Sequence, residues 1–227
     1  IFVVSRRDRA DAEKILKLKV DNNPTVPDNY LQLAAHYYTQ KDRPKMQATL
    51  SRLTADTKTF PTAYRSVGDF YLRIKDVDSA IQNYQEGIKV DGKQKHLYQK
   101  RIIEALVMQD KKQEATTILN EILKEDPKDD EAVAIRASLF MLSGSREQLQ
   151  SAINDLQSVV SRMPDNPVLR FNLGRAHLAK GNVQQARIQF EEAIKLRQDY
   201  LLPRIALAQI LQQNGEFGRV VQMANEV

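Results

Sequence analysis

The chain has 227 residues, of which 42% are hydrophobic and 28% are charged, so it lies in the range of an ordinary folded protein and can bury a large core. No apolar run approaches the roughly 20 residues of a membrane-spanning helix, and the lack of cysteine excludes disulfides, thiolate nucleophiles and cysteine-ligated zinc. The net charge of +5 raises the question of nucleic-acid binding. The absence of cysteine is compatible with a cytoplasmic or a periplasmic location.

Residues 1–26 have the pattern of the second half of a helical hairpin. Ile1 to Val4 form an apolar tail, and a charged turn follows. Ala12 and Leu16 then begin a helix at the spacing expected of one apolar face. The segment predicts a partial unit that lacks its first helix.

Residues 27–60 and 61–95 each contain two apolar runs at helical spacing, separated by a short polar break. In the second of these units Gly68 and Ala80 leave room for two helices to approach closely, and Tyr71 lies one turn beyond Gly68. Asp76 or Asp78 is placed to cap its second helix. Both units predict a helix, a tight turn and a second helix.

Residues 96–129 and 130–166 repeat this pattern with two departures. Ala115 keeps the small slot of the second helix, but Ile103 replaces the small residue of the first, which predicts wider packing of that pair. In the next unit Ala152 is displaced by about three residues. We expect these extra residues, around 145–150, to lengthen the turn between the helices.

The clearest unit is residues 167–200. Gly174 and Ala186 mark a close helix approach, Gly181 breaks the helical pattern, and Phe190 fills the space beside the small residues. Residues 201–227 restart the pattern in phase and stop within a second helix.

These spacings and the period of about 34 residues resemble the tetratricopeptide repeat. The resemblance implies an all-α fold, a right-handed α-solenoid or superhelix of stacked antiparallel helix pairs. We expect one continuous array over residues 1–227 without a second domain. Its units are a partial repeat 1–26, full repeats 27–60, 61–95, 96–129, 130–166 and 167–200, and a partial repeat 201–227.

No constellation in the sequence indicates catalysis, a metal or a cofactor. His177 aligns with Tyr37 and Tyr71 of sister repeats, which favours a packing role over a catalytic one. Paired carboxylates such as Glu191 and Glu192 are adjacent on a helix and point in different directions, and neither a phosphate loop nor a metal-binding motif occurs. The sequence therefore predicts a non-enzymatic protein.

In tetratricopeptide arrays the first helix of each pair lines a concave groove, so the resemblance implies a scaffold that binds a protein or peptide there. A basic segment of this predicted groove precedes an apolar one, which suits a peptide with acidic and hydrophobic anchors. The candidate peptide-binding residues are Tyr38, Arg65, Asp69, Arg73, Lys100, Arg101, Met141, Phe171, Asn172 and Arg175.

Two alternatives stay open at this point. An RNA-binding helical repeat is suggested by the basic pI, but the net charge of single repeats ranges from −2 to +3 without a sustained basic stripe, which argues against nucleic acid. A regulatory array attached to a catalytic domain is the second alternative.

The two ends carry apolar residues where solenoids usually have polar caps. Ile1 to Val4 open the chain, and Val220, Val221, Met223 and Val227 close it. We therefore expect a fragment of a longer bacterial repeat protein, with self-association through its uncapped ends.

Overall fold

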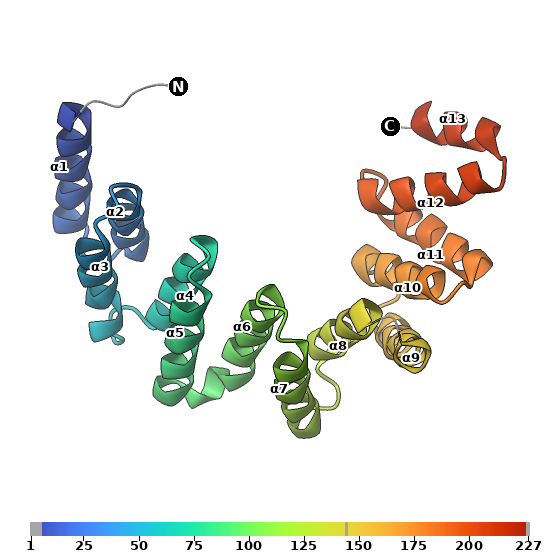
Figure 1. Ribbon diagram of the computed structural model, residues 1–227, viewed down its shortest axis with the longest axis horizontal. Helices are drawn as coiled ribbons and strands as arrows, with labels where there is room; N and C mark the ends of the chain where they lie inside the picture. The colour runs from blue at the N-terminus through green and yellow to red at the C-terminus, as the bar shows by residue number, and fades with distance from the viewer. Residues whose placement is uncertain (1–5, 144, 226–227) are drawn as a thin grey trace. The chain divides into compact units, whose positions relative to one another are not determined.

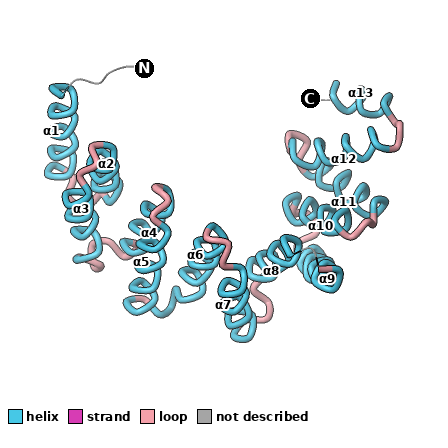
Figure 2. Tube along the Cα trace, in the orientation of Figure 1, coloured by secondary structure: helices cyan, strands magenta, loops and turns pink. Residues whose placement is uncertain are grey.

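The computed structural model describes residues 6–143 and 145–225. These residues form thirteen α-helices and one 3-10 turn, without a strand among them (Figure 1 and Figure 2). Sequential helices pair in antiparallel fashion, and the chain divides into two compact units, residues 1–111 and residues 112–227. The all-α class predicted from the sequence is confirmed.

Unit 1 contains the helices drawn from blue to green in Figure 1. Its elements are α1 (Arg6–Asn22), α2 (Pro27–Thr39), α3 (Arg43–Ala55), α4 (Ala63–Arg73), α5 (Val77–Val90), a 3-10 turn (Gly92–Gln94) and α6 (Lys95–Met108). Each helix packs on its neighbour in sequence, most extensively within the pairs α2 and α3 and α4 and α5.

Unit 2 continues with the same organisation. Its helices are α7 (Lys112–Glu125), α8 (Asp130–Ser143), α9 (Arg146–Arg162), α10 (Pro167–Ala179), α11 (Val183–Leu196), α12 (Leu201–Gln213) and α13 (Phe217–Asn225). The helices α10, α11 and α12 lie side by side around one hydrophobic core, which includes Phe190, Leu207 and Ile210 (Figure 1).

Two helix pairs depend on a glycine that faces an aromatic ring. A Cβ atom on Gly68 of α4 would lie 2.3 Å from the ring of Tyr84 in α5, and a Cβ on Gly174 of α10 would lie 2.5 Å from the ring of Phe190 in α11. Real side chains do not approach that closely, and both rings are fully buried. The close approach expected at Gly68 and Gly174 is therefore present.

Among the described residues, five of the turns inside helix pairs contain one residue with a left-handed backbone. Gly181 has φ 88° and Gly215 has φ 76°, a region that glycine enters without a steric penalty. In unit 1 the same turn position is held by Lys41 with φ 60°, by Lys75 with φ 63° and by Asp110 with φ 58°. The fold fixes the backbone at this position but tolerates more than one side chain.

A recurring hydrogen bond joins each of three repeats to the end of the preceding helix. Tyr30 Oη donates to the carbonyl of Pro24 at 2.8 Å, six residues earlier. The Nε atoms of Arg170 and Arg204 donate at the same offset, 3.1 Å to the Pro164 carbonyl and 2.8 Å to the Gln198 carbonyl respectively. Tyrosine and arginine are interchangeable here because each supplies a long apolar stem with a donor at its end.

The extra residues of the repeat 130–166 correct our expectation of a longer turn. They extend the second helix instead, since α9 has 17 residues where α11 has 14. Ser145 caps α9 and accepts a hydrogen bond from the backbone N–H of Gln148. A serine followed three residues later by glutamine is a helix-start signal, so the insertion adds about one turn of helix.

Asp76 is the N-cap of α5 and accepts from the N–H of Ser79 at 3.3 Å, as one of the two expected alternatives. The wider packing predicted around Ile103, the single continuous array and its right-handed superhelical course stay predictions. Ile103 itself is buried in α6.

The C-terminal helix corrects part of our expectation about the ends. Val220 and Met223 are partly buried against the core of unit 2, because α13 packs on α12, whereas Val221 is exposed. Ile1 to Val4 and Val227 lie outside the described residues. Self-association through the ends stays a prediction.

The packing of Gly174 against Phe190 can be tested with a mutant cycle. Gly174→Ala should lower the free energy of unfolding by roughly 1–3 kcal/mol through overpacking, partly offset by a helix-propensity gain of about 1 kcal/mol. In a Phe190→Leu background, Gly174→Ala should be neutral or stabilising. The repeat 27–60 already combines alanine and leucine at the equivalent positions, as Ala34 and Leu50. Urea denaturation measures the cycle.

Gly92→Ala is the matched control, because no atom lies within 4 Å of a Cβ placed there. Equal destabilisation by Gly174→Ala in both backgrounds would show that the Phe190 ring is not the constraint.

Candidate functional site

One face of α4 carries three of the predicted peptide-binding residues. Arg65, Asp69 and Arg73 are spaced four residues apart, which places them in one stripe along the helix. Tyr84 Oη donates to Asp69 Oδ1 at 2.7 Å, and Nε of Arg101 lies 3.7 Å from the same oxygen. We call Arg65, Asp69 and Arg73 the α4 stripe.

The buried Tyr84 donates a hydrogen bond to Asp69 through an uncharged hydroxyl group. Burial of the phenol, followed by its hydrogen bond to the Asp69 carboxylate, raises the pKa of Tyr84 far above its usual range. The phenol is therefore uncharged near neutral pH, and its O–H donates to the Asp69 side chain. Asp69 is fixed by this contact and is less available to a ligand than its position on the surface suggests.

The four cations of the predicted basic segment divide into two kinds. Arg101 donates to Glu104 at 2.9 Å and also lies against Asp69, and Lys100 is likewise engaged by another group. Arg65 and Arg73 form no ion pair with any other residue in the described part of the chain. Of these four cations, only the two arginines of α4 therefore have a charge that no ion pair within the described residues offsets.

In unit 2 the structure corrects one predicted site residue. Phe171 is only 9% exposed and lies in the core, with ring-centroid distances of 5.7 Å to Phe190 and 5.5 Å to Tyr200. The guanidinium of Arg175 lies over the Phe171 ring, 5.8 Å from its centroid. Phe171 is thus a core residue and not a free anchor.

The remaining predicted residues of unit 2 are accessible in part. Met141 of α8 and Asn172 of α10 are half-buried, and Arg175 is exposed. Asn172 and Arg175 lie on α10, and Met141 lies on α8, the first helix of the preceding repeat. The helices α8 and α10 are in contact.

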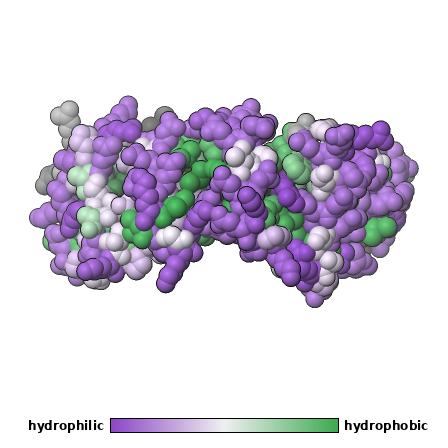
Figure 3. All heavy atoms as spheres, turned by 90° about the horizontal axis from the view of Figure 1, so that it is seen from below, coloured by the Kyte–Doolittle hydropathy of each residue, from purple (hydrophilic) through white to green (hydrophobic). Residues whose placement is uncertain are grey.

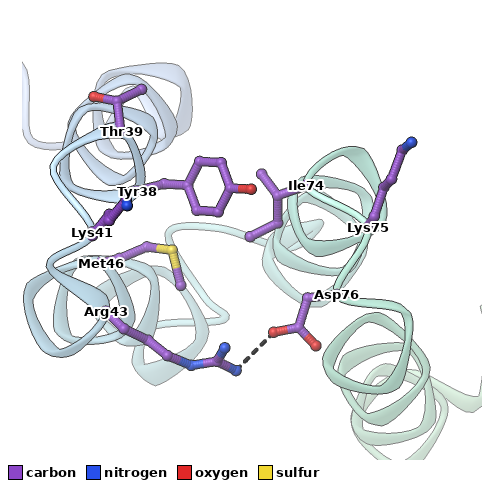
Figure 4. A pocket seen from close by; sticks show the side chains of 8 residues that line it. All are labelled: Tyr38, Thr39, Lys41, Arg43, Met46, Ile74, Lys75 and Asp76. Carbon is purple, nitrogen blue, oxygen red and sulfur yellow. Dashed lines mark hydrogen bonds and ion pairs between the residues drawn. The ribbon is translucent and has the colours of Figure 1, made fainter.

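Tyr38, the first of the predicted residues, lies in a pocket of about 690 Å³ within unit 1 (Figure 4). Lys41, Ile74 and Lys75 are among the other residues that line it, and none of them belongs to the predicted peptide-binding residues. The sequence does contain one indication for Lys41 and Lys75, because each is a lysine at a turn position that glycine occupies in later repeats.

The visible surface in Figure 3 is mostly hydrophilic, with smaller hydrophobic areas between the charged side chains. Among the described residues, no group of three or more His, Cys, Asp or Glu side chains is arranged to hold a metal ion. None of the helices in that part of the chain combines the length and the apolar character that crossing a bilayer requires.

His177 is buried in α10, as its alignment with Tyr37 and Tyr71 suggests. Burial, and then the nearby charge of Lys180, lower the pKa of His177 below its ordinary value. The side-chain nitrogen of Asn182 lies 3.4 Å from Nδ1, a contact that suits an uncharged ring accepting from the amide. His177 therefore packs as a neutral side chain.

Comparison with known proteins agrees with these helix pairs. Residues 145–199 match the family model described as tetratricopeptide repeat. This segment of the chain carries tetratricopeptide repeat sequence. No curated protein matches the sequence.

Several solved tetratricopeptide repeat structures share the fold. A tetratricopeptide repeat protein from Parabacteroides merdae superimposes with a TM-score of 0.63 at 17% identity, over 96% of this chain and 85% of its own. MamA from Desulfovibrio magneticus, residues 41 to the end, gives a TM-score of 0.60 at 17% identity, covering 72% of this chain and 90% of its own. YrrB, described as a TPR protein with an unusual peptide-binding site, gives 0.52 at 17% identity, over 84% and 96%.

The neutral state of His177 predicts a pH dependence of stability. Because the pKa is lower in the folded than in the unfolded chain, the unfolded chain gains the proton first as the pH falls. Stability should fall, by up to about 1.4 kcal/mol per pH unit, between the ordinary histidine pKa and the lowered one. His177→Tyr should flatten this slope in urea denaturation measured between neutral and mildly acidic pH.

His36→Tyr is the matched control, since it removes one histidine from another first helix. An equal flattening by both variants would contradict the assignment of the slope to His177.

Proposed function

We propose that this tetratricopeptide repeat chain is a non-enzymatic scaffold that binds an acidic peptide or protein segment along the first helices of unit 1. The observation that carries the proposal is the pair of arginines on α4, Arg65 and Arg73, for which the described residues supply no ion-pair partner. Repeat proteins of this kind usually bind their partners on the surface of the first helices.

The geometry of the α4 stripe constrains the ligand. Arg65 and Arg73 are eight residues apart, about 12 Å along a helix. An extended peptide advances about 13 Å in four residues, so carboxylates four positions apart match the two guanidinium groups. Arginine suits this role because its planar guanidinium can bind a carboxylate through two parallel hydrogen bonds.

The fixed state of Asp69 favours this geometry. Its carboxylate is already held by Tyr84 and Arg101, so it separates the two arginines without neutralising either through an ion pair. A ligand carboxylate directly above Asp69 would be repelled, which disfavours acidic residues that are only two positions apart.

Fold similarity supports peptide binding as the general function. YrrB, a protein of the same fold, is described as having a peptide-binding site. In unit 2, Met141, Asn172 and Arg175 offer apolar and polar contacts to a peptide. We also propose a bacterial source, in line with the relatives from Parabacteroides merdae and Desulfovibrio magneticus.

Charge reversal of the stripe tests the proposal. The probe is a labelled peptide about twelve residues long, with a glutamate at every fourth position and only glycine and serine between. Arg65→Glu with Arg73→Glu should weaken its binding at least about tenfold, because two attractive contacts become repulsive. Fluorescence anisotropy measures the affinity, which should also fall as salt is added.

Lys14→Glu with Lys58→Glu is the matched control, since both lysines are exposed in unit 1 and lie outside the stripe. Binding that is equal in the stripe variant and the wild type would refute this location. A peptide with glutamates two positions apart should bind more weakly than the probe.

A further inference from the structure

The pocket beside Tyr38 lies between two neighbouring helix pairs of unit 1. The end of α2 and the start of α3 form one wall, and the end of α4 with the following turn forms the other (Figure 4). Its volume of about 690 Å³ is large enough for several side chains of a ligand. The pocket is built by residues of both repeats, so neither helix pair forms it alone.

The centre of the pocket is apolar. The Tyr38 and Ile74 side chains point toward one another across the opening, and Met46 lies below them (Figure 4). Met46 is only 2% exposed and forms a fixed floor, whereas Tyr38 is 47% exposed to water. An aliphatic side chain inserted between Tyr38 and Ile74 would remove apolar surface of these two residues from water and would rest on Met46.

An ion pair closes the lower side of the pocket. Arg43 Nη2 lies 2.7 Å from Asp76 Oδ2, and the other oxygen of Asp76 accepts from the N–H of Ser79. The Asp76 carboxylate is therefore committed within the protein and offers little to a cationic ligand. It also holds the Arg43 guanidinium in place at the pocket wall.

Two lysines stand at the rim, in turns that do not require them. Lys41 and Lys75 both have a left-handed backbone, at the position that Gly181 and Gly215 occupy in later repeats. In the part of the chain that the structure describes, neither ammonium group forms a hydrogen bond or an ion pair. With Arg43 against the single carboxylate of Asp76, the lining has a positive excess that is complementary to an acidic ligand.

We infer that this pocket anchors an acidic peptide by holding one apolar side chain between Tyr38 and Ile74, with flanking carboxylates against Lys41 and Lys75. The inference rests on the proposed peptide-binding function and adds an anchor outside the α4 stripe. An apolar anchor supplies the affinity, and the lysines select ligands with acidic residues on both sides of it.

The test uses three short labelled peptides and two variants. The first peptide has a central leucine with two glutamates on each side, the second has serine in place of leucine, and the third has glutamine in place of every glutamate. The wild type should bind the first at least about tenfold more tightly than either of the others. Tyr38→Ala should lose the preference for leucine, and Lys41→Gly with Lys75→Gly should lose the preference for glutamate.

The glycine variants suit this test because Gly181 and Gly215 already occupy the equivalent turns, so folding should be retained. Circular dichroism and urea denaturation verify this. Lys58→Ser with Lys93→Ser, which removes two exposed lysines of unit 1 outside the pocket, should bind all three peptides like the wild type.

The outcomes separate this inference from the proposed function. If the leucine peptide binds equally to the wild type, Tyr38→Ala and the glycine variant, the pocket is not the anchor, whatever the result for the α4 stripe. If Arg65→Glu with Arg73→Glu abolishes binding of the long glutamate peptide while no short peptide binds, the inference fails and the proposed function stands. If light scattering shows self-association that Tyr38→Ala abolishes, a second copy occupies the pocket and the inference is overturned.

Discussion

The glycine opposite a buried aromatic ring determines how closely the two helices of a pair can pack. In the pair α4 and α5 this constraint also shapes the proposed binding surface. Gly68 lets the Tyr84 ring pass beneath α4, and the phenol oxygen then reaches Asp69 at 2.7 Å. In unit 2 the equivalent space is filled by Phe190, which has no hydroxyl group. The hydroxyl of Tyr84 therefore adds a polar contact to a packing arrangement that is otherwise apolar.

The turns inside the helix pairs fix the backbone conformation at one position more strictly than they fix the side chain there. A left-handed backbone occurs at one position in five of these turns, and glycine at Gly181 and Gly215 adopts it at the lowest steric cost. Lys41 and Lys75 adopt it less easily, since a Cβ atom disfavours this conformation. Packing does not select lysine here, and both side chains lie beside the pocket that contains Tyr38. A residue that the fold merely tolerates is a better indicator of binding than one that the fold requires.

Most of the helix-pair pattern could be predicted from the sequence, because small residues, apolar spacing and caps such as Asp76 act locally. The start of α9 was missed since a three-residue shift looks the same whether it lengthens a turn or a helix, and only the Ser145 cap decides between them. Phe171 was misassigned for a different reason. Its ring lies against Phe190 of its own helix pair, and Tyr200 and the next repeat cover it further. The spacing within one repeat carries no information about the contact with the next repeat.

Because contacts between repeats cannot be predicted from the spacing within one repeat, the sequence alone does not show whether a charged side chain has a structural role or is available to a ligand. Arg170 and Arg204 occupy the position of Tyr30 and donate to backbone carbonyls of the preceding helix end, so their charge serves the junction between repeats. Arg65 sits one position beyond the equivalent place and has no such bond to make. Two arginines that differ by one position in the repeat can therefore differ in role. The hydrogen bond to a backbone carbonyl recurs across repeats and marks Arg170 and Arg204 as structural residues, whereas Arg65 remains available to a ligand.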